Sequence, residues 1–142
     1  MTAYADTSFL FSLYIPDSNA RSAVAKIGAA ARPLIVSEFG EFEFVNALAL
    51  RVFRKELRAT EVNAVFSLFQ DDVNRELVRV APISASSFDR AKQIARKYTP
   101  TLGVRALDAL HVASAVALRA STFYTFDRSQ AKLAAACGLR VP

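Results

Sequence analysis

The sequence is poor in cysteine, glycine and histidine, and each shortage argues against a class of site. A single cysteine, Cys137, cannot form an internal disulfide or a cysteine-cluster zinc site. The four glycines form no glycine-rich phosphate loop. The chain has one histidine, His111, and none of its serines lies in the nucleophile-elbow motif of a Ser-His-Asp hydrolase. We therefore set aside disulfide-stabilised folds, zinc fingers, P-loop enzymes and serine hydrolases.

No leader or membrane span is evident either. Met1 is followed at once by a short apolar segment and an acid, where a signal peptide has a basic segment and a long apolar run. The most apolar stretch, residues 106–118, contains Asp108 and His111 and is short for a membrane span. We expect a buried helix there, and a cytoplasmic protein with no membrane partner.

Length and charge narrow the possibilities further. A chain of 142 residues and 15.5 kDa can bury a core of its own, so we expect one domain spanning residues 1–142. The apolar share of 53% is high, which suggests surface buried against another subunit or protein. A formal charge of +5 favours a polyanionic partner such as nucleic acid.

Short β-branched or aromatic runs alternate with longer segments at helical spacing. Strands are predicted at residues 2–5, 33–36, 77–80, 122–126 and 139–141. Helices are predicted from residue 7, from 17 or 18 to 31, and over 37–55, 60–74 (Thr60 as N-cap), 84 or 86 to 99, 104–119 and 129–136. Residues 98–103 are expected to form a loop. The alternation predicts an α/β fold, with a mainly parallel sheet of about five strands covered on both faces.

Four acidic side chains stand where a carboxylate needs a partner. Asp6 and Asp127 each follow an apolar strand, and Glu43 and Asp108 interrupt apolar helical segments. A buried carboxylate is normally neutralised, paired or bound to a metal. In open α/β sheets the site lies at the carboxyl ends of the strands, where Asp6 and Asp127 are expected. Four converging carboxylates with few basic neighbours predict a divalent cation.

Acid-only sites suit Mg²⁺ or Mn²⁺, which prefer hard oxygen ligands. Such ions polarise a phosphoryl oxygen and activate water, so phosphodiester hydrolysis is the natural reaction. Each acid taken alone is more simply read as a turn or cap residue. A phosphoaspartate site would also use strand-end acids, but the start of this chain offers Asp6 without a second acid beside it.

The remaining polar residues allow two interpretations each. His111 follows Asp108 by three residues, and it either orients that carboxylate or packs its helix. Basic residues cluster in two segments: Arg51, Arg54, Lys55 and Arg58, and Arg90, Lys92, Arg96 and Lys97. Each cluster either tracks a phosphate backbone or forms a solvated helix face.

The order of these motifs resembles PIN-domain proteins, specifically the VapC-type toxins of type II toxin–antitoxin pairs. The start, residues 4–10 (YADTSFL), is similar to the opening strand and first acid of that family. The second block is matched by Ser37, Glu43 and Asn46, the third by residues 105–113 (RALDALHVA), and the fourth by Thr125 and Asp127. The resemblance covers nearly the whole chain and implies the PIN-like three-layer α/β/α sandwich.

What the resemblance implies is a Mg²⁺- or Mn²⁺-dependent endoribonuclease with four catalytic acids and two supporting hydroxyls. These are Asp6, Glu43, Asp108 and Asp127, and Ser8 and Thr125. In the family pattern the three aspartates are metal ligands, and the glutamate binds a second ion or positions water.

The resemblance also implies an RNA substrate, a homodimer, and an antitoxin whose C-terminal tail covers the acidic groove. Two other hypotheses stay open at this point. One is a non-catalytic RNA- or antitoxin-binding module whose acids serve arginines of the partner. The other is a PIN nuclease of RNA processing outside any toxin pair.

Overall fold

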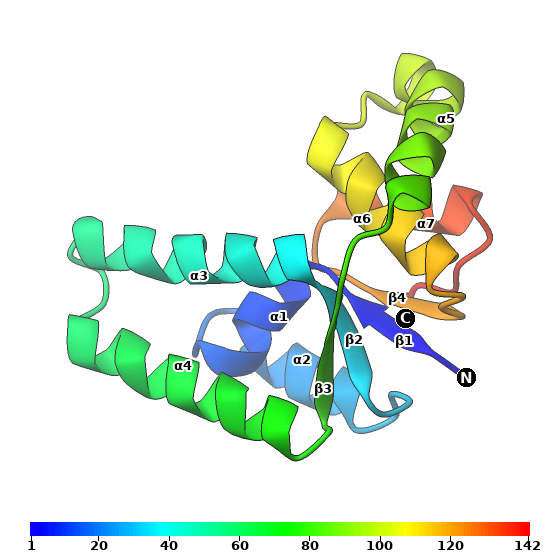
Figure 1. Ribbon diagram of the computed structural model, residues 1–142. Helices are drawn as coiled ribbons and strands as arrows, with labels where there is room; N and C mark the ends of the chain where they lie inside the picture. The colour runs from blue at the N-terminus through cyan, green and yellow to red at the C-terminus, as the bar shows by residue number, and fades with distance from the viewer.

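A four-stranded parallel sheet forms the centre of the computed structural model, which describes residues 1–142 (Figure 1). Its strands are β1 (Ala3–Ala5), β2 (Leu34–Ser37), β3 (Val78–Ala81) and β4 (Thr122–Tyr124). They lie in the order β3-β2-β1-β4. In the register, Tyr4 of β1 stands opposite Ile35 on one side and Phe123 on the other. The predicted α/β fold with a parallel sheet is confirmed.

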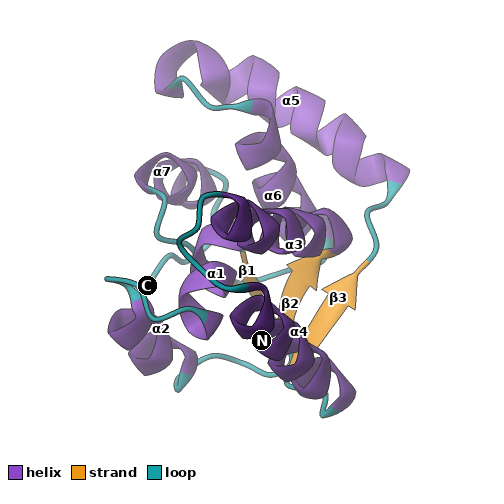
Figure 2. Ribbon diagram, turned by 90° about the vertical axis from the view of Figure 1, so that its left-hand side faces the viewer, coloured by secondary structure: helices purple, strands orange, loops and turns teal.

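Helices cover both faces of this sheet. One face carries α1 (Thr7–Tyr14), α2 (Ala20–Ile27), α3 (Glu38–Phe53) and α4 (Ala59–Asn74). The other carries α5 (Ala85–Leu102), α6 (Ala106–Ala117) and α7 (Arg128–Ala136). Figure 2 shows α5, α6 and α7 on one side of the strands and α1, α2 and α4 on the other. The three-layer α/β/α arrangement expected from the sequence is therefore present.

The strands divide the core by simple alternation. Successive side chains of a strand point to opposite faces. Ala3 and Ala5 therefore pack with the core under α1–α4, whereas Tyr4 packs with the core under α5–α7. The same alternation sends Tyr124 to the first core and Phe123 to the second. Because both faces are covered, β1, β2 and β4 are buried along their whole length, whereas the edge strand β3 exposes Arg79.

The chain reverses its direction across the sheet at β1. The connections step from β1 to β2 and β3 on one side, and the chain then returns to β4 on the other side of β1. Ligand sites of open parallel sheets lie outside the carboxyl ends of the strands at such a switch point. Asp6 directly follows β1, and its backbone N–H donates to the Tyr124 carbonyl at 3.1 Å. Asp127 lies three residues beyond the end of β4.

Three details differ from the sequence predictions. The fifth strand expected at residues 139–141 is reduced to a single bridge between Thr122 and Arg140. The predicted N-cap Thr60 lies inside α4, which begins one residue earlier and follows Arg58, a residue that makes no side-chain cap. Short terminal strands and uncapped helix starts depend on tertiary packing, which local sequence does not encode.

The loop predicted at residues 98–103 is also wrong, because α5 runs through Pro100 to Leu102. Pro100 lacks the backbone N–H that would donate to the Arg96 carbonyl, and only Thr101 and Leu102 of the helix follow it. The helix stops instead at Gly103, whose left-handed φ of 63° suits glycine. As expected, residues 106–118 form a buried helix; none of the helices has the length and hydropathy that crossing a membrane requires.

The packing of α3 gives a test of this fold. Phe44 is 0% exposed in the core under α3, whereas Phe53 on the same helix is 82% exposed. We expect Phe44→Ala to lower the free energy of unfolding by about 3–5 kcal/mol, since it leaves a cavity. Phe53→Ala should change it by less than about 0.5 kcal/mol. Urea unfolding measures both, and equal losses in the two variants would contradict the placement of α3.

Candidate active site

Asp6 is fully buried at the carboxyl end of β1. Its Oδ1 accepts hydrogen bonds from Ser8 Oγ at 2.7 Å and from the Phe9 backbone N–H at 2.9 Å. Its Oδ2 accepts a short hydrogen bond from Thr125 Oγ1. Burial raises the pKa of Asp6, while the hydrogen bonds from Thr125, Phe9 and Ser8 oppose that rise. All the hydrogen bonds to the Asp6 carboxylate come from neutral donors, and His111 opposes the rise through its charge.

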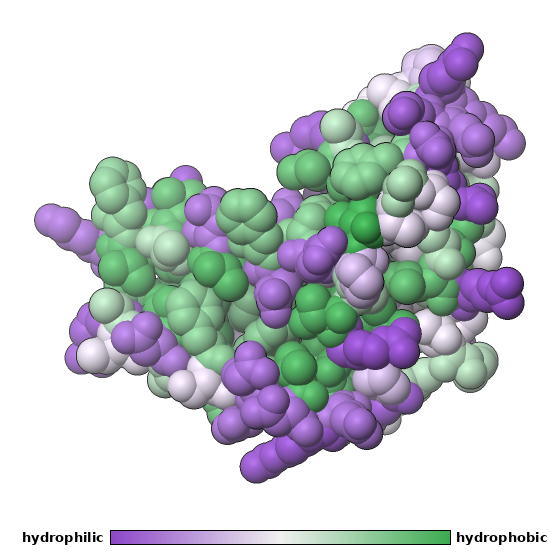
Figure 3. Space-filling view, viewed as in Figure 1, coloured by the Kyte–Doolittle hydropathy of each residue, from purple (hydrophilic) through white to green (hydrophobic).

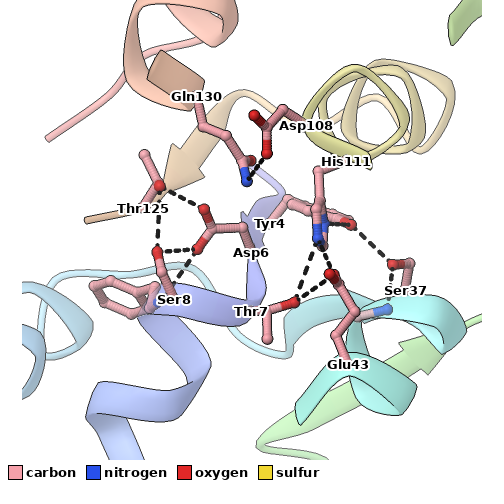
Figure 4. Close-up of polar contacts among 12 residues, drawn as sticks. Tyr4, Asp6, Thr7, Ser8, Ser37, Glu43, Asp108, His111, Thr125 and Gln130 are labelled. Carbon is pink, nitrogen blue, oxygen red and sulfur yellow. Dashed lines mark hydrogen bonds and ion pairs between the residues drawn. The ribbon is translucent and has the colours of Figure 1, made fainter. Parts of the chain in front are cut away.

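The two hydroxyls predicted to support the site both reach Asp6. Ser8 Oγ also accepts a hydrogen bond from the Phe126 backbone N–H at 3.0 Å, and Thr125 Oγ1 accepts one from the Asp127 N–H at 2.9 Å. Figure 4 shows Ser8 and Thr125 on the same side of the Asp6 carboxylate. These bonds join the start of α1 to the segment after β4, so the surroundings of Asp6 are fixed by two loops.

Asp108 and Asp127 are joined through one residue, Gln130. The Gln130 Nε2 donates to Asp108 Oδ1 at 3.1 Å, and the Gln130 backbone N–H donates to Asp127 Oδ1 at 3.0 Å, which makes Asp127 the N-cap of α7. The other oxygen of Asp108, Oδ2, is buried without a hydrogen-bond partner. Arg105 Nε lies 3.7 Å from it, but that side chain is 83% exposed, and such ion pairs contribute little.

One carboxylate oxygen of Glu43, Oε1, contacts two side chains. Thr7 Oγ1 donates to Glu43 Oε1 at 2.7 Å, and His111 Nε2 lies 2.7 Å from the same oxygen. Burial raises the pKa of Glu43, but the hydrogen bonds from His111 and Thr7 outweigh it and leave the pKa below its ordinary value. On the far side of the ring, His111 Nδ1 lies 2.9 Å from the Tyr4 hydroxyl, which donates to Ser37 Oγ at 3.0 Å.

Gly40 lets α3 approach this histidine. A Cβ on Gly40 would lie 3.3 Å from His111 Cε1 and 3.2 Å from Ser37 Oγ, closer than ordinary packing allows. Ser37 Oγ also accepts the Gly40 backbone N–H at 3.1 Å, which confirms Ser37 as the start of this helix. His111 therefore contacts Glu43, and the interpretation in which it orients Asp108 is not supported by any contact in the structure.

The four predicted acids thus lie at one edge of the sheet in two hydrogen-bonded groups. The aspartate group contains Asp6, Asp108 and Asp127 with Ser8, Thr125 and Gln130. The glutamate group contains Glu43 with Thr7, His111, Tyr4 and Ser37. As the side chains lie, no three acidic, histidine or cysteine side chains form a group that could hold a metal ion. The four acids that the sequence predicted as a single converging set therefore lie in two adjacent groups, and each carboxylate has its own hydrogen-bond donors.

Three residues of these groups were not anticipated from the sequence. Gln130 follows Asp127 by three residues, the spacing of a capping box, and that signal would have located it at this edge. Tyr4 stands between Ala3 and Ala5, and strand alternation places its side chain on the opposite face of the sheet from theirs. Nothing in the sequence indicates that the Thr7 hydroxyl reaches Glu43.

The family model of the PIN domain matches residues 3–136. No curated protein matches the chain. Among solved structures, VapC20 of Mycobacterium tuberculosis, a sarcin-ricin loop cleaving toxin, superposes with a TM-score of 0.71 at 19% identity, over 97% of this chain and 96% of that one. FitAcB of Neisseria gonorrhoeae gives 0.69 at 20% identity over 99% and 96%. VapBC-1 of nontypeable Haemophilus influenzae gives 0.67 at 14% over 100% and 97%. At identities this low, these superpositions show a shared fold and nothing more.

The burial of Asp6 predicts that replacing its carboxylate by a neutral amide stabilises the protein at neutral pH. Because the pKa of Asp6 is raised on folding, the folded chain holds this proton more tightly than the unfolded chain, and ionisation above the folded-state pKa costs stability. In chelator at about pH 7.5, Asp6→Asn should therefore unfold at a higher urea concentration than the wild type.

The difference in stability between Asp6→Asn and the wild type should shrink as the pH falls through the folded-state pKa of Asp6 toward about 4, the ordinary pKa of aspartate. Asp89→Asn is the matched control, because Asp89 is exposed and pairs with Lys92. A less stable Asp6→Asn variant at neutral pH, or a gain that does not vary with pH, would show that Asp6 is not a buried charge held against its desolvation.

Proposed function

This chain belongs to the PIN domain family, and from that premise we propose that it is a metal-dependent endoribonuclease acting as the toxin of a toxin–antitoxin pair. The observation that carries the proposal is the aspartate group: Asp6 is fully buried and forms no ion pair, and a buried Asp108 oxygen accepts no hydrogen bond and has only the exposed Arg105 side chain 3.7 Å away. A bound cation offsets the cost of such charges. We take residues 1–142 as one catalytic domain working in the cytoplasm.

The chemistry of the aspartate group fits Mg²⁺ or Mn²⁺. Every candidate ligand is a carboxylate oxygen, the donor that these hard ions prefer. In the proposal Asp6, Asp108 and Asp127 hold the ion, and Asp108 offers its free Oδ2 while Gln130 keeps the other oxygen. The ion, when bound, polarises a phosphoryl oxygen and lowers the pKa of water.

The chain's own residues divide the remaining work. The Ser8 and Thr125 hydroxyls hold the Asp6 carboxylate in one orientation, as the partners of metal ligands do. We assign to Glu43, whose lowered pKa keeps it ionised at neutral pH, the orientation of the attacking water. Attack by water on phosphorus, with departure of the 3′ oxygen, leaves a 5′-phosphate and a 3′-hydroxyl.

The proposed partners are an antitoxin and a second copy of the chain. One of the similar structures is a toxin–antitoxin complex from Klebsiella pneumoniae. In the present chain, apolar side chains gather along α3 and α4 on the face shown in Figure 3. Beside Glu43, Phe42 and Leu107 line an open hollow and are 72% and 51% exposed. Exposed apolar surface of this kind favours a protein interface, and we propose it for the homodimer.

A second candidate is a non-catalytic RNA- or antitoxin-binding PIN module. One observation favours it: the acids do not stand as a ready three-ligand group. In that case the carboxylates would serve arginines of a partner. A PIN nuclease of RNA processing outside any toxin pair would share the chemistry of the first proposal and differ in its partners.

Cleavage of RNA by the purified protein tests the proposal. We expect discrete fragments of total cellular RNA in Mg²⁺ or Mn²⁺ and none in chelator. Asp6→Asn and Asp108→Asn should each lose about 100-fold or more of this activity, because each removes a ligand. Thr125→Val should lose less, about 10- to 100-fold, since it removes one bond to Asp6. Asp89→Asn, an exposed acid outside the site, is the control for lost charge.

Circular dichroism confirms that each variant is folded before activities are compared. Full cleavage by folded Asp108→Asn would overturn the assignment of the aspartates. Complete absence of cleavage by the wild type in either metal, after removal of any copurified inhibitor, with RNA still bound in chelator, would favour the binding module.

A further inference from the structure

A cavity of about 540 Å³ adjoins the aspartate group and is not used by the chemistry described above. Ser8 and Asp127 contribute to its wall from the acidic site, while Arg51 and Arg54 contribute from the last turns of α3. A helix rises 1.5 Å per residue, so these arginines stand about 12 and 16 Å along the axis from Glu43. They therefore lie about two to three helical turns beyond Glu43, at the other end of the cavity from the acidic site.

Arg51 is held over the cavity by two contacts. Its Nη1 lies 2.9 Å from Glu56 Oε2, and its guanidinium carbon lies 5.0 Å from the centre of the Phe11 ring. Phe11 itself is buried and lines the same cavity. A guanidinium fixed on two sides keeps its remaining N–H donors in a defined direction, which reduces the entropy lost when an anion binds.

Arg54 differs from Arg51, because it is exposed and takes part in none of the ion pairs of the structure. The one acid of the cavity outside the active site, Asp17, is already engaged by Ser12 Oγ at 2.7 Å and by the Asn19 backbone N–H at 2.9 Å. At the basic end of the cavity Glu56 already pairs with Arg51, so the charge that remains available there is that of Arg54.

We infer that Arg51 and Arg54 bind a flanking phosphate of the RNA strand, and that the cavity holds the nucleotide between that phosphate and the one that is cut. The inference rests on the proposed function and adds a binding subsite to it. Guanidinium groups match phosphate oxygens with paired hydrogen bonds. The acidic end, which would repel phosphate without a cation, and the basic end, which attracts it, give the strand a defined position across the site.

Continuity and charge favour RNA over a protein segment in this cavity. Its wall includes Ser8 and Asp127 of the active site, so a substrate strand entering the site passes along it. The chain also carries a net charge of +5, which attracts a polyanion. A peptide of the antitoxin is the competing occupant, and the experiment distinguishes the two.

Arg54→Gln and Arg58→Gln form a matched pair of variants. Both arginines are exposed and lie four residues apart, but Arg58 pairs with Glu61 and does not line the cavity. Binding of a fluorescent single-stranded RNA 12-mer is measured by anisotropy in chelator at several salt concentrations. We expect Arg54→Gln to raise the Kd about tenfold and to lower the slope of log Kd against log salt by about 0.7. Arg58→Gln should stay within about twofold of the wild type.

Arg54→Lys adds a test of geometry, since it keeps the charge and loses the planar fork; it should recover the salt slope but only part of the affinity. In cleavage assays, Arg54→Gln should raise KM and leave kcat unchanged, because the flanking phosphate is bound equally in the ground and transition states.

Equal Kd values for Arg54→Gln and Arg58→Gln would overturn the inference, since the effect would then be one of net charge. So would an Arg54→Gln variant that binds RNA normally but loses its copurified antitoxin. If the wild type cleaved no RNA and Arg54→Gln still bound RNA about tenfold more weakly, the nuclease proposal would fail and the phosphate subsite would stand. If Arg54→Gln bound RNA as the wild type does and metal-dependent cleavage was normal, the phosphate subsite would fail and the nuclease proposal would stand.

Discussion

The buried carboxylate of Asp6 connects the fold to the site. It caps α1, accepts the Thr125 hydroxyl from beyond β4, and lies where the order of strands reverses across the sheet. Without it, the start of α1 and the loop after β4 would lose the bonds that hold them together. The same burial raises the pKa of Asp6, so a group that organises the structure also carries a charge that the protein does not neutralise by itself.

The two groups of acids handle negative charge in opposite ways. Glu43 has its charge stabilised internally, because His111 and Thr7 lower its pKa. The balance differs for the aspartates: burial outweighs the hydrogen bonds to Asp6, and Asp108 leaves one buried oxygen without a hydrogen bond beside an Arg105 side chain that is largely exposed. Groups with environments this different take different roles. In the proposed function, the aspartates hold a cation and the glutamate orients water.

Much of this arrangement follows from sequence rules that concern single elements. Strand ends predict that Asp6 and Asp127 share an edge, and helical spacing predicts that Glu43 and Asp108 face inward. What those rules do not contain is the distance between elements. The close approach of α3 and α6 at Gly40 directs His111 to Glu43 and away from Asp108, and only the packed structure fixes that choice. The division of the acids into two groups follows from the same approach.

Binding of Mn²⁺ to the purified protein tests the role of the aspartates most directly, because it needs neither an RNA substrate nor a partner. Isothermal titration calorimetry after treatment with chelator should show saturable binding to the wild type, and Asp108→Asn should lose at least about tenfold in affinity because it removes the unpartnered buried oxygen. Asp89→Asn should bind as the wild type does. Equal affinities for wild type and Asp108→Asn, or no saturable binding to either, would contradict a cation site built from these aspartates.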